Sequence, residues 1–150
     1  MLAKLLIFCC NEVIDIMGFI RYNNHPYQDD IDDCVIRALA TFFDTTWDKA
    51  YLMLVSQGYK MKLFPNNRND VWGALLHEMG CDFAYINFTC PTCVTVEKFA
   101  DAHPHGRYIL GTTTHAIAVI NGNYYDTWDS GQEYPVYYFT KKGDRESDIS

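Results

Sequence analysis

The sequence predicts one α+β domain in which helices precede a β-sheet. Between residues 34 and 103, apolar residues recur with the spacing of buried or half-buried helices. After residue 106 the pattern changes to short runs rich in β-branched and aromatic residues, which favour strands. Asn121-Gly122 lies between two of these runs and is the strongest hairpin signal in the chain. Helices and strands that are segregated along 150 residues are typical of a single α+β domain with its own core.

Four helices are expected, each between a capping residue and a stop signal. Residues 34–43 are too continuously apolar for an exposed strand, so they predict a buried helix. Asp, Asn and Thr at the N-cap and Gly or Pro at the end indicate the boundaries. The predicted helices are 34–43, 47–58, 70–80 and 96–103. Their expected N-caps are, in the same order, Asp32 or Asp33, Thr45 or Thr46, Asn67 or Asn69, and Thr95. Gly58 and Gly80 are expected to end the second and third helices, and Pro104 follows the fourth.

Four strands are expected after the helices, at 107–111, 115–120, 124–128 and 133–139.

The domain itself is predicted to span 17–140. Residues 1–16 are interpreted as an N-terminal extension with a short strand or helix, and residues 141–150 as a polar, frayed tail. The apolar run near the N-terminus is short and is followed by Glu12 and Asp15, which argues against a signal peptide and a membrane span.

Charge and cysteine content narrow the functional classes. A net charge of −7, with no basic cluster beyond Lys141-Lys142, argues against a nucleic-acid partner. The six cysteines are expected to be mostly reduced, because a chain of this length can fold without disulfides. These features predict a cytoplasmic protein without a membrane partner. The expected partner is a polypeptide substrate or another protein, no cofactor or metal is expected, and the oligomeric state is left open.

Cys34 has an unusual setting in the run QDDIDDCVIRA. It follows four carboxylates and opens the first predicted helix, and the dipole of a helix N-terminus stabilises a thiolate. The neighbouring carboxylates act against that charge. If Asp33 is the N-cap, its side chain points at backbone amides, and the other acids must face solvent. Cys34 is therefore a candidate nucleophile that needs a cationic partner, since a lone cysteine is more often a small buried hydrophobe.

The hairpin supplies such a partner. With Asn121-Gly122 as the two-residue loop, counting outward pairs Ile117 with Asp126 and His115 with Trp128. Asp126 and His115 are then diagonal neighbours on one face, within roughly 7–8 Å between backbones, so the carboxylate can orient the imidazole. A cysteine, a histidine and an orienting carboxylate form the set used for nucleophilic catalysis.

The nucleophile segment resembles that of a known family. Gln28-x4-Asp33-Cys34, with Ala38 four residues further on, is similar to the nucleophile motif of papain-like cysteine peptidases, most closely the bacteriocin-processing type. The resemblance implies that Gln28 supplies the oxyanion hole together with the backbone N–H of Cys34. Val35 departs from the pattern, which usually has glycine after the cysteine.

Two downstream segments extend the resemblance over residues 22–139. The run from His115 to Val119 resembles the histidine strand of these enzymes, and Asp126-Thr-Trp128 resembles their Asn/Asp-Ser-Trp segment, in which the tryptophan shields the histidine pair. The resemblance implies a papain-like fold with the nucleophile at the start of the first core helix and an antiparallel sheet. The catalytic set that it implies is Cys34, His115, Asp126 and Gln28.

The predicted function is a cysteine-dependent hydrolase or acyl-transfer enzyme: a peptidase, an isopeptidase or a glutamine amidase. The alternative is a catalytically inactive papain-like domain that binds a protein as an inhibitor or adaptor. The acidic charge, the small size of the domain and Val35 are compatible with this alternative. A third hypothesis is a zinc-stabilised interaction module built on Cys90-x2-Cys93. A redox or local disulfide pair of these two cysteines is a further alternative, and two ordinary loop thiols are the favoured interpretation. The other candidate zinc ligands are Cys81, His103 and His105, and Trp47, Trp72 and Trp128 are predicted to lie in the core.

Overall fold

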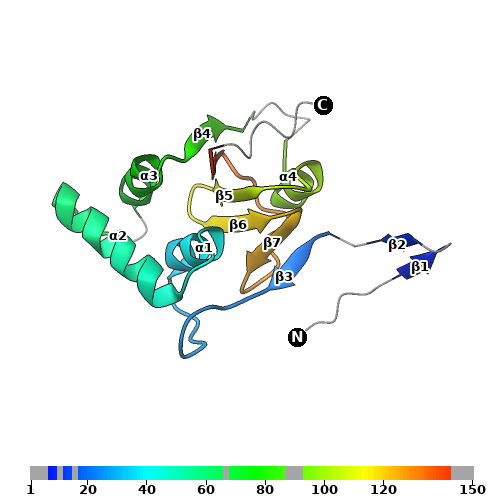
Figure 1. The fold of residues 1–150 in the computed structure, drawn as a ribbon, viewed down its shortest axis with the longest axis horizontal. Coiled ribbons are helices and arrows are strands. Elements are labelled where there is room, and N and C mark those ends of the chain that lie inside the picture. The colour runs from blue at the N-terminus through cyan, green and yellow to red at the C-terminus, as the bar shows by residue number, and fades with distance from the viewer. Residues whose placement is uncertain (1–6, 10–11, 15–16, 66–67, 87–92, 143–150) are drawn as a thin grey trace.

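A six-stranded mixed sheet organises the described part of the fold (Figure 1). The computed structural model describes residues 7–9, 12–14, 17–65, 68–86 and 93–142. All neighbouring strands of this sheet are antiparallel except the parallel pair β3 and β7, so the expectation of a purely antiparallel sheet is wrong. The strand order is β3 (Phe19–Arg21), β7 (Asn123–Asp126), β6 (Ala116–Ile120), β5 (Arg107–Gly111), β8 (Tyr137–Thr140) and β4 (Asp82–Tyr85).

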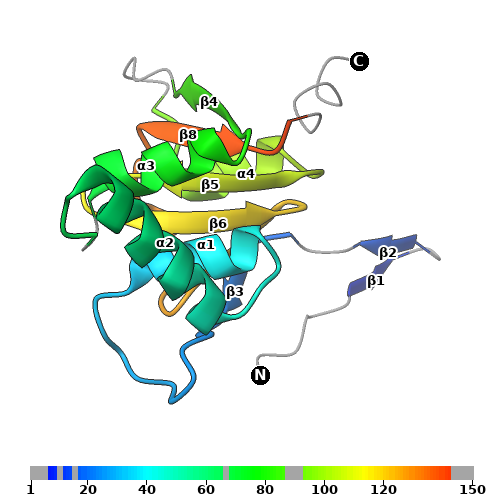
Figure 2. The ribbon, with the colours of Figure 1, turned by 60° about the vertical axis from the view of Figure 1, so that its left-hand side comes forward.

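Helices cover both faces of this sheet (Figure 2). One face is covered by α1 (Cys34–Phe42) and α3 (Asn69–Glu78), on which α2 (Trp47–Met61) packs, and the other face by α4 (Val96–Ala102). Neighbouring residues of β5 show the alternation, because Ile109 joins the core under α1–α3 whereas Leu110 joins the core under α4. The α+β class and the layout of helices followed by strands are therefore as predicted.

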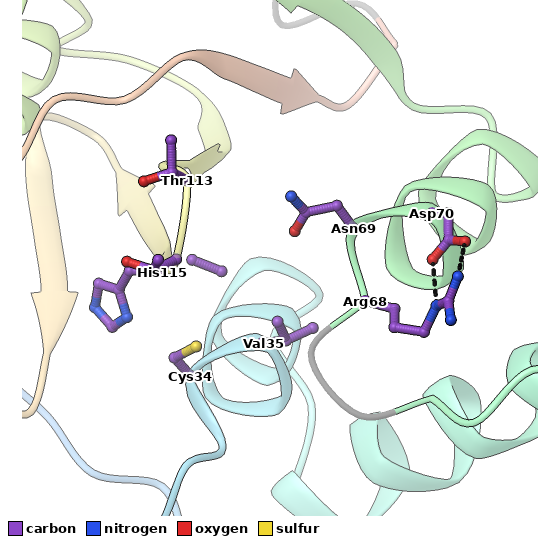
Figure 3. A pocket seen from close by; sticks show the side chains of 9 residues that line it. Cys34, Val35, Arg68, Asn69, Asp70, Thr113 and His115 are labelled. Atoms are coloured by element: carbon purple, nitrogen blue, oxygen red, sulfur yellow. Dashed lines mark hydrogen bonds and ion pairs between the residues drawn. The ribbon is translucent and has the colours of Figure 1, made fainter.

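The predicted hairpin is present and has the predicted register. Asn121 and Gly122 both have positive φ, as a two-residue hairpin loop of this type requires, and Ile120 pairs with Asn123. Helix α1 packs along β6 of this hairpin. The start of α1 and the start of β6 therefore lie side by side, which brings together the two segments that contain Cys34 and His115 (Figure 3).

The far end of α1 is tied to the same sheet. Arg107 of β5 donates hydrogen bonds from Nε to the Phe42 carbonyl oxygen (2.7 Å) and from Nη2 to the Thr41 carbonyl oxygen (2.5 Å). A cation bonded to the last carbonyls of a helix satisfies acceptors that have no partner within the helix. Helix α1 is thus fixed to the sheet at its C-terminal end, while its N-terminal end faces the candidate site.

Several predicted boundaries are wrong. Helix α2 continues past Gly58 and ends at Met61, with Lys62, which has a φ of 57°, as its C-cap. Gly58 lies inside the helix, where the following loop packs on it, and a Cβ there would lie 2.8 Å from the Leu63 carbonyl oxygen. Strand β8 begins at Tyr137 instead of at residue 133. The caps of α2 and α4 are Thr46 and Thr95, as predicted, whereas α3 is capped by Arg68 instead of Asn67 or Asn69.

Strands β3 and β4 were not predicted. They lie at the two edges of the sheet and have only three and four residues, which is too short for a clear alternating pattern. The proposed extension 1–16 contains β1 (Ile7–Cys9) and β2 (Glu12–Ile14), which pair with each other, and its other residues lie outside the described ones. Most of the proposed tail, 143–150, also lies outside them. Within the described ranges, no helix is long and apolar enough to cross a membrane.

Candidate active site

Cys34 is the first residue of α1 and lines a pocket of about 330 Å³ (Figure 3). The side chain is 5% exposed, so access to it is through this pocket. The walls come from the starts of α1 and α3 and from the loop between β5 and β6. The lining residues are Cys34, Val35, Arg68, Asn69, Asp70 and residues 113–116.

His115 and Asp126 form a buried pair beside Cys34. The His115 Nε2 atom lies 2.6 Å from Asp126 Oδ2, and the two side chains are 12% and 1% exposed. His115 is the residue just before β6 and Asp126 is the last residue of β7, so the hairpin register brings them together as predicted.

The electrostatic environment holds a proton on His115. Burial acts against the imidazolium charge, but the hydrogen bond with Asp126 and the electrostatic influence of Asp126 and Cys34 outweigh it and raise the pKa of His115 to about 9. Because Asp126 occupies Nε2, Nδ1 is the ring nitrogen that is left for Cys34, and both residues lie at the wall of the pocket (Figure 3). Burial raises the pKa of Asp126, and the hydrogen bond and charge of His115 reverse this and lower it.

Asp33 is the N-cap of α1, but its side chain does not bond the helix amides as expected. Its Oδ1 accepts from Arg37 Nε (2.6 Å) and its Oδ2 from Trp47 Nε1 (2.8 Å). The nearest carboxylate is therefore turned toward a cation instead of toward Cys34. The first amides of α1 lack the usual side-chain cap, and such amides bind anions readily.

Arg37 is a residue of the site that sequence reasoning missed. Its Nη1 lies 3.2 Å from Asp126 Oδ1 and 3.4 Å from Thr127 Oγ1, while its Nε bonds Asp33. The i,i+4 spacing of Asp33 and Arg37 on a helix was a readable signal for that pair. The contact with Asp126, which is 89 residues away in the chain, had no such signal.

Trp128 shields the pair from outside the core. Its ring stacks on that of His115, with centroids 5.5 Å apart and planes at 30°. This is the place that the resemblance implied, but the side chain is 45% exposed, so the prediction of a core residue is wrong. Trp47 is only half-buried, because it bonds Asp33 and stacks on Tyr51, whereas Trp72 is buried as predicted.

The structure does not bring Gln28 to the pocket. Its side chain is exposed, and its Nε2 donates to the carbonyl oxygens of Asn23 (2.9 Å) and His25 (3.0 Å). The residue has a φ of 59°, which folds the loop back on itself. The amide that was predicted to hold an oxyanion is thus occupied by the backbone of its own loop.

Asn69 is a second residue that the sequence analysis did not assign to the site. Its Oδ1 accepts a hydrogen bond from Trp72 Nε1 (3.1 Å), which determines the orientation of the amide and leaves Nδ2 as the donor end. The side chain extends toward the pocket (Figure 3). The neighbouring Arg68 and Asp70 bond each other across 2.8 Å, so they present no unpaired charge to a substrate.

The cysteine region considered for zinc differs from the prediction. Cys93 is disulfide-bonded instead of being an ordinary thiol, and Cys90 lies outside the described residues. A disulfide sulfur is not a thiolate ligand. Among the residues that the structure describes, no three His, Cys, Asp or Glu side chains are grouped to hold a metal ion.

Comparisons with protein-family models, with curated proteins and with solved structures find no significant match for this chain.

Proposed function

We propose that the protein is a cysteine-dependent hydrolase or acyl-transfer enzyme with a papain-like arrangement, in which Cys34 is the nucleophile, His115 the general acid and base, and Asp126 the residue that orients His115. The observation that supports it best is that Cys34 and His115 line one pocket and that Asp126 bonds the same His115 across 2.6 Å. Such a set converts a weak nucleophile into a reactive one.

The mechanism follows from the order of these contacts. In the resting site His115 already holds the proton of the Cys34 thiol, because the pKa of His115 is raised to about 9, and the thiolate sulfur attacks a substrate carbonyl carbon. The oxyanion lies against the first amides of α1, including that of Cys34, where the helix dipole stabilises negative charge. When the C–N bond breaks, the imidazolium gives its proton to the leaving amine. Water, deprotonated by the neutral imidazole, then releases the acid, or a second amine accepts the acyl group.

The proposed substrate is a peptide bond, an isopeptide bond or a glutamine side-chain amide of a polypeptide. The pocket beside Cys34 combines the Asn69 amide with the loop that contains Thr113, and its one ion pair is satisfied internally. These groups suit an uncharged acyl group that accepts hydrogen bonds. The reaction uses protein side chains alone, and the proposed location is the cytoplasm.

Acylation by a small activated ester tests the proposal. With p-nitrophenyl acetate, the wild-type protein is expected to release a burst of about one p-nitrophenolate per chain as Cys34 becomes acetylated, since deacylation of an unnatural acyl group is slow. Cys34→Ser is expected to abolish the burst. Cys81→Ser is the matched control, because Cys81 is also a free cysteine but does not line the pocket, and it should retain the burst. Acetyl groups spread over several residues, with no burst, would favour the inactive binding domain instead.

The same assay decides the role of Gln28. Because its amide is bonded within its own loop, Gln28→Ala is expected to change the burst rate by less than about threefold, whereas the loss of an oxyanion donor typically costs on the order of 10²–10³. A decrease of that larger size would show that the loop rearranges when substrate binds and that Gln28 acts as the resemblance implied. Circular dichroism would verify that the variant is folded.

A further inference from the structure

We infer that Arg37 controls the proton affinity of His115 through Asp126: its guanidinium, shared between Asp33 and Asp126, limits the negative charge that acts on the imidazole. The inference rests on the proposed function, since it concerns the same site. It makes Arg37 a positioning residue, because it touches neither the nucleophile nor the substrate pocket.

The contacts of Asp126 divide its two oxygens between different partners. Oδ2 faces His115, while Oδ1 lies 3.2 Å from Arg37 Nη1 and accepts the backbone N–H of Thr127 at 2.8 Å. The backbone amide alone can keep the carboxylate in its orientation. Unlike the backbone amide of Thr127, Arg37 places a full positive charge beside the buried carboxylate of Asp126.

The second carboxylate makes that charge necessary. Asp33 and Asp126 are 1% and 2% exposed, so neither is neutralised by solvent, and charges in such surroundings interact strongly. Arg37 lies between them, with its side chain 11% exposed. Burial lowers the pKa of Arg37, but the hydrogen bonds and charges of Asp33 and then Asp126 raise it above its ordinary value, so the cation is permanent.

The remaining charged groups around His115 do not compensate for a loss of Arg37. From β7 the imidazole meets Asp126, and from α1 it meets Cys34, both of which favour its charged form. Across the pocket, α3 contributes Arg68 and Asp70, which form an ion pair with each other. Without Arg37, two buried carboxylates would act on His115 with no cation between them, and the imidazole would hold its proton too tightly to release it to a leaving group.

The test is a titration of His115 by NMR in Arg37→Gln and Arg37→Lys. Arg37→Gln removes the charge, so the His115 transition is expected to move upward by on the order of one pH unit. Arg37→Lys keeps the charge and should leave the transition near its wild-type position, although it cannot reproduce the forked contacts. A purely structural role would lower the stability of both variants and leave the transition unchanged. An unchanged or lower transition in a folded Arg37→Gln protein would overturn the inference.

A second variant, Asp33→Asn, is expected to shift the His115 transition in the opposite direction, so the inference can still be tested if Arg37→Gln does not fold. Asp33→Asn removes one buried negative charge and frees Arg37 to act on Asp126 alone, so the His115 transition is expected to move downward. No movement in this variant would also count against the inference. The proposed function fails by a different result, which is a wild-type His115 that titrates near its ordinary value of about 6.5.

Discussion

Cys34 is expected to react with iodoacetamide at pH 6 on the order of 100 times faster than Cys81, and His115→Gln is expected to remove this advantage. An ordinary thiol near pH 6 is less than about 1% ionised, whereas a neighbouring imidazolium favours the thiolate, which is the form that reacts. The effect is smaller than the ratio of ionised fractions, because a stabilised thiolate is a weaker nucleophile. Peptide-mapped mass spectrometry, with time points from pH 5 to 9, measures both cysteines in one sample.

Cys81 is an internal reference for this experiment. It is a free, half-buried cysteine whose pKa is raised by burial, and it has no histidine partner of the kind that Cys34 has. In urea the two cysteines should react at similar rates, which separates the folded site from the local sequence. A Cys34 that reacts more slowly than Cys81 in the folded protein would contradict the nucleophile assignment and direct attention to what the domain binds.

Asp126→Asn is expected to lower the rate of ester acylation on the order of 10³-fold, although the geometry of the site changes little. Asparagine can still accept the Thr127 amide and the Arg37 guanidinium with its oxygen. Its amide nitrogen then faces His115 Nε2 as a donor, so the neutral imidazole has its proton on Nδ1. That nitrogen can no longer accept the proton of Cys34.

The same variant changes the dependence on pH in a direction that the charges determine. With the wild-type pKa of about 9, His115 is charged below pH 9 and loses its charge as the pH rises through that value. Anionic iodoacetate is attracted by the imidazolium and neutral iodoacetamide is not, so the ratio of their rates at Cys34 should fall near pH 9. In Asp126→Asn this fall should occur at lower pH, closer to 6.5.

Asp129→Asn provides the control for Asp126→Asn. Asp129 is three residues further along the same segment, but it accepts hydrogen bonds from the Tyr124 hydroxyl (2.7 Å) and the Gly131 amide (3.1 Å) instead of contacting His115. Its replacement is expected to leave both the acylation rate and the position of the pH transition unchanged. If Asp129→Asn and Asp126→Asn had the same effects, the orienting role of Asp126 would be wrong.

The parts of the fold that depend on neighbours in the chain could be predicted. Asn121-Gly122 specified a loop with two positive φ values, and the register of the hairpin then followed by counting, including the approach of His115 and Asp126. Thr46 and Thr95 specified helix starts because each hydroxyl accepts an amide of its own first turn. In each case the partner is within a few residues or follows from one local turn.

The parts that failed depend on contacts that the local sequence patterns did not specify. Strand β3 has three residues and no alternation of its own, and it exists because β7, about a hundred residues later, pairs with it. Gly58 stopped no helix, and instead it leaves room for the loop after α2, which packs on it. Asp33 does not cap with its side chain because Trp47 and Arg37 compete for its carboxylate.

Some features of the candidate site were determined by the sequence and others only by the tertiary structure. The amino-acid sequence by itself determined the candidate nucleophile at the start of a helix and its candidate base on a hairpin, because helix periodicity, capping and turn chemistry act over a few residues. Only the tertiary structure decided that Gln28 bonds its own loop, that Trp128 covers His115 from the surface, and that Arg37 joins Asp33 to Asp126. The contact between Arg37 and Asp126 forms when α1 packs on the sheet, and burial strengthens the interactions among the charges around His115.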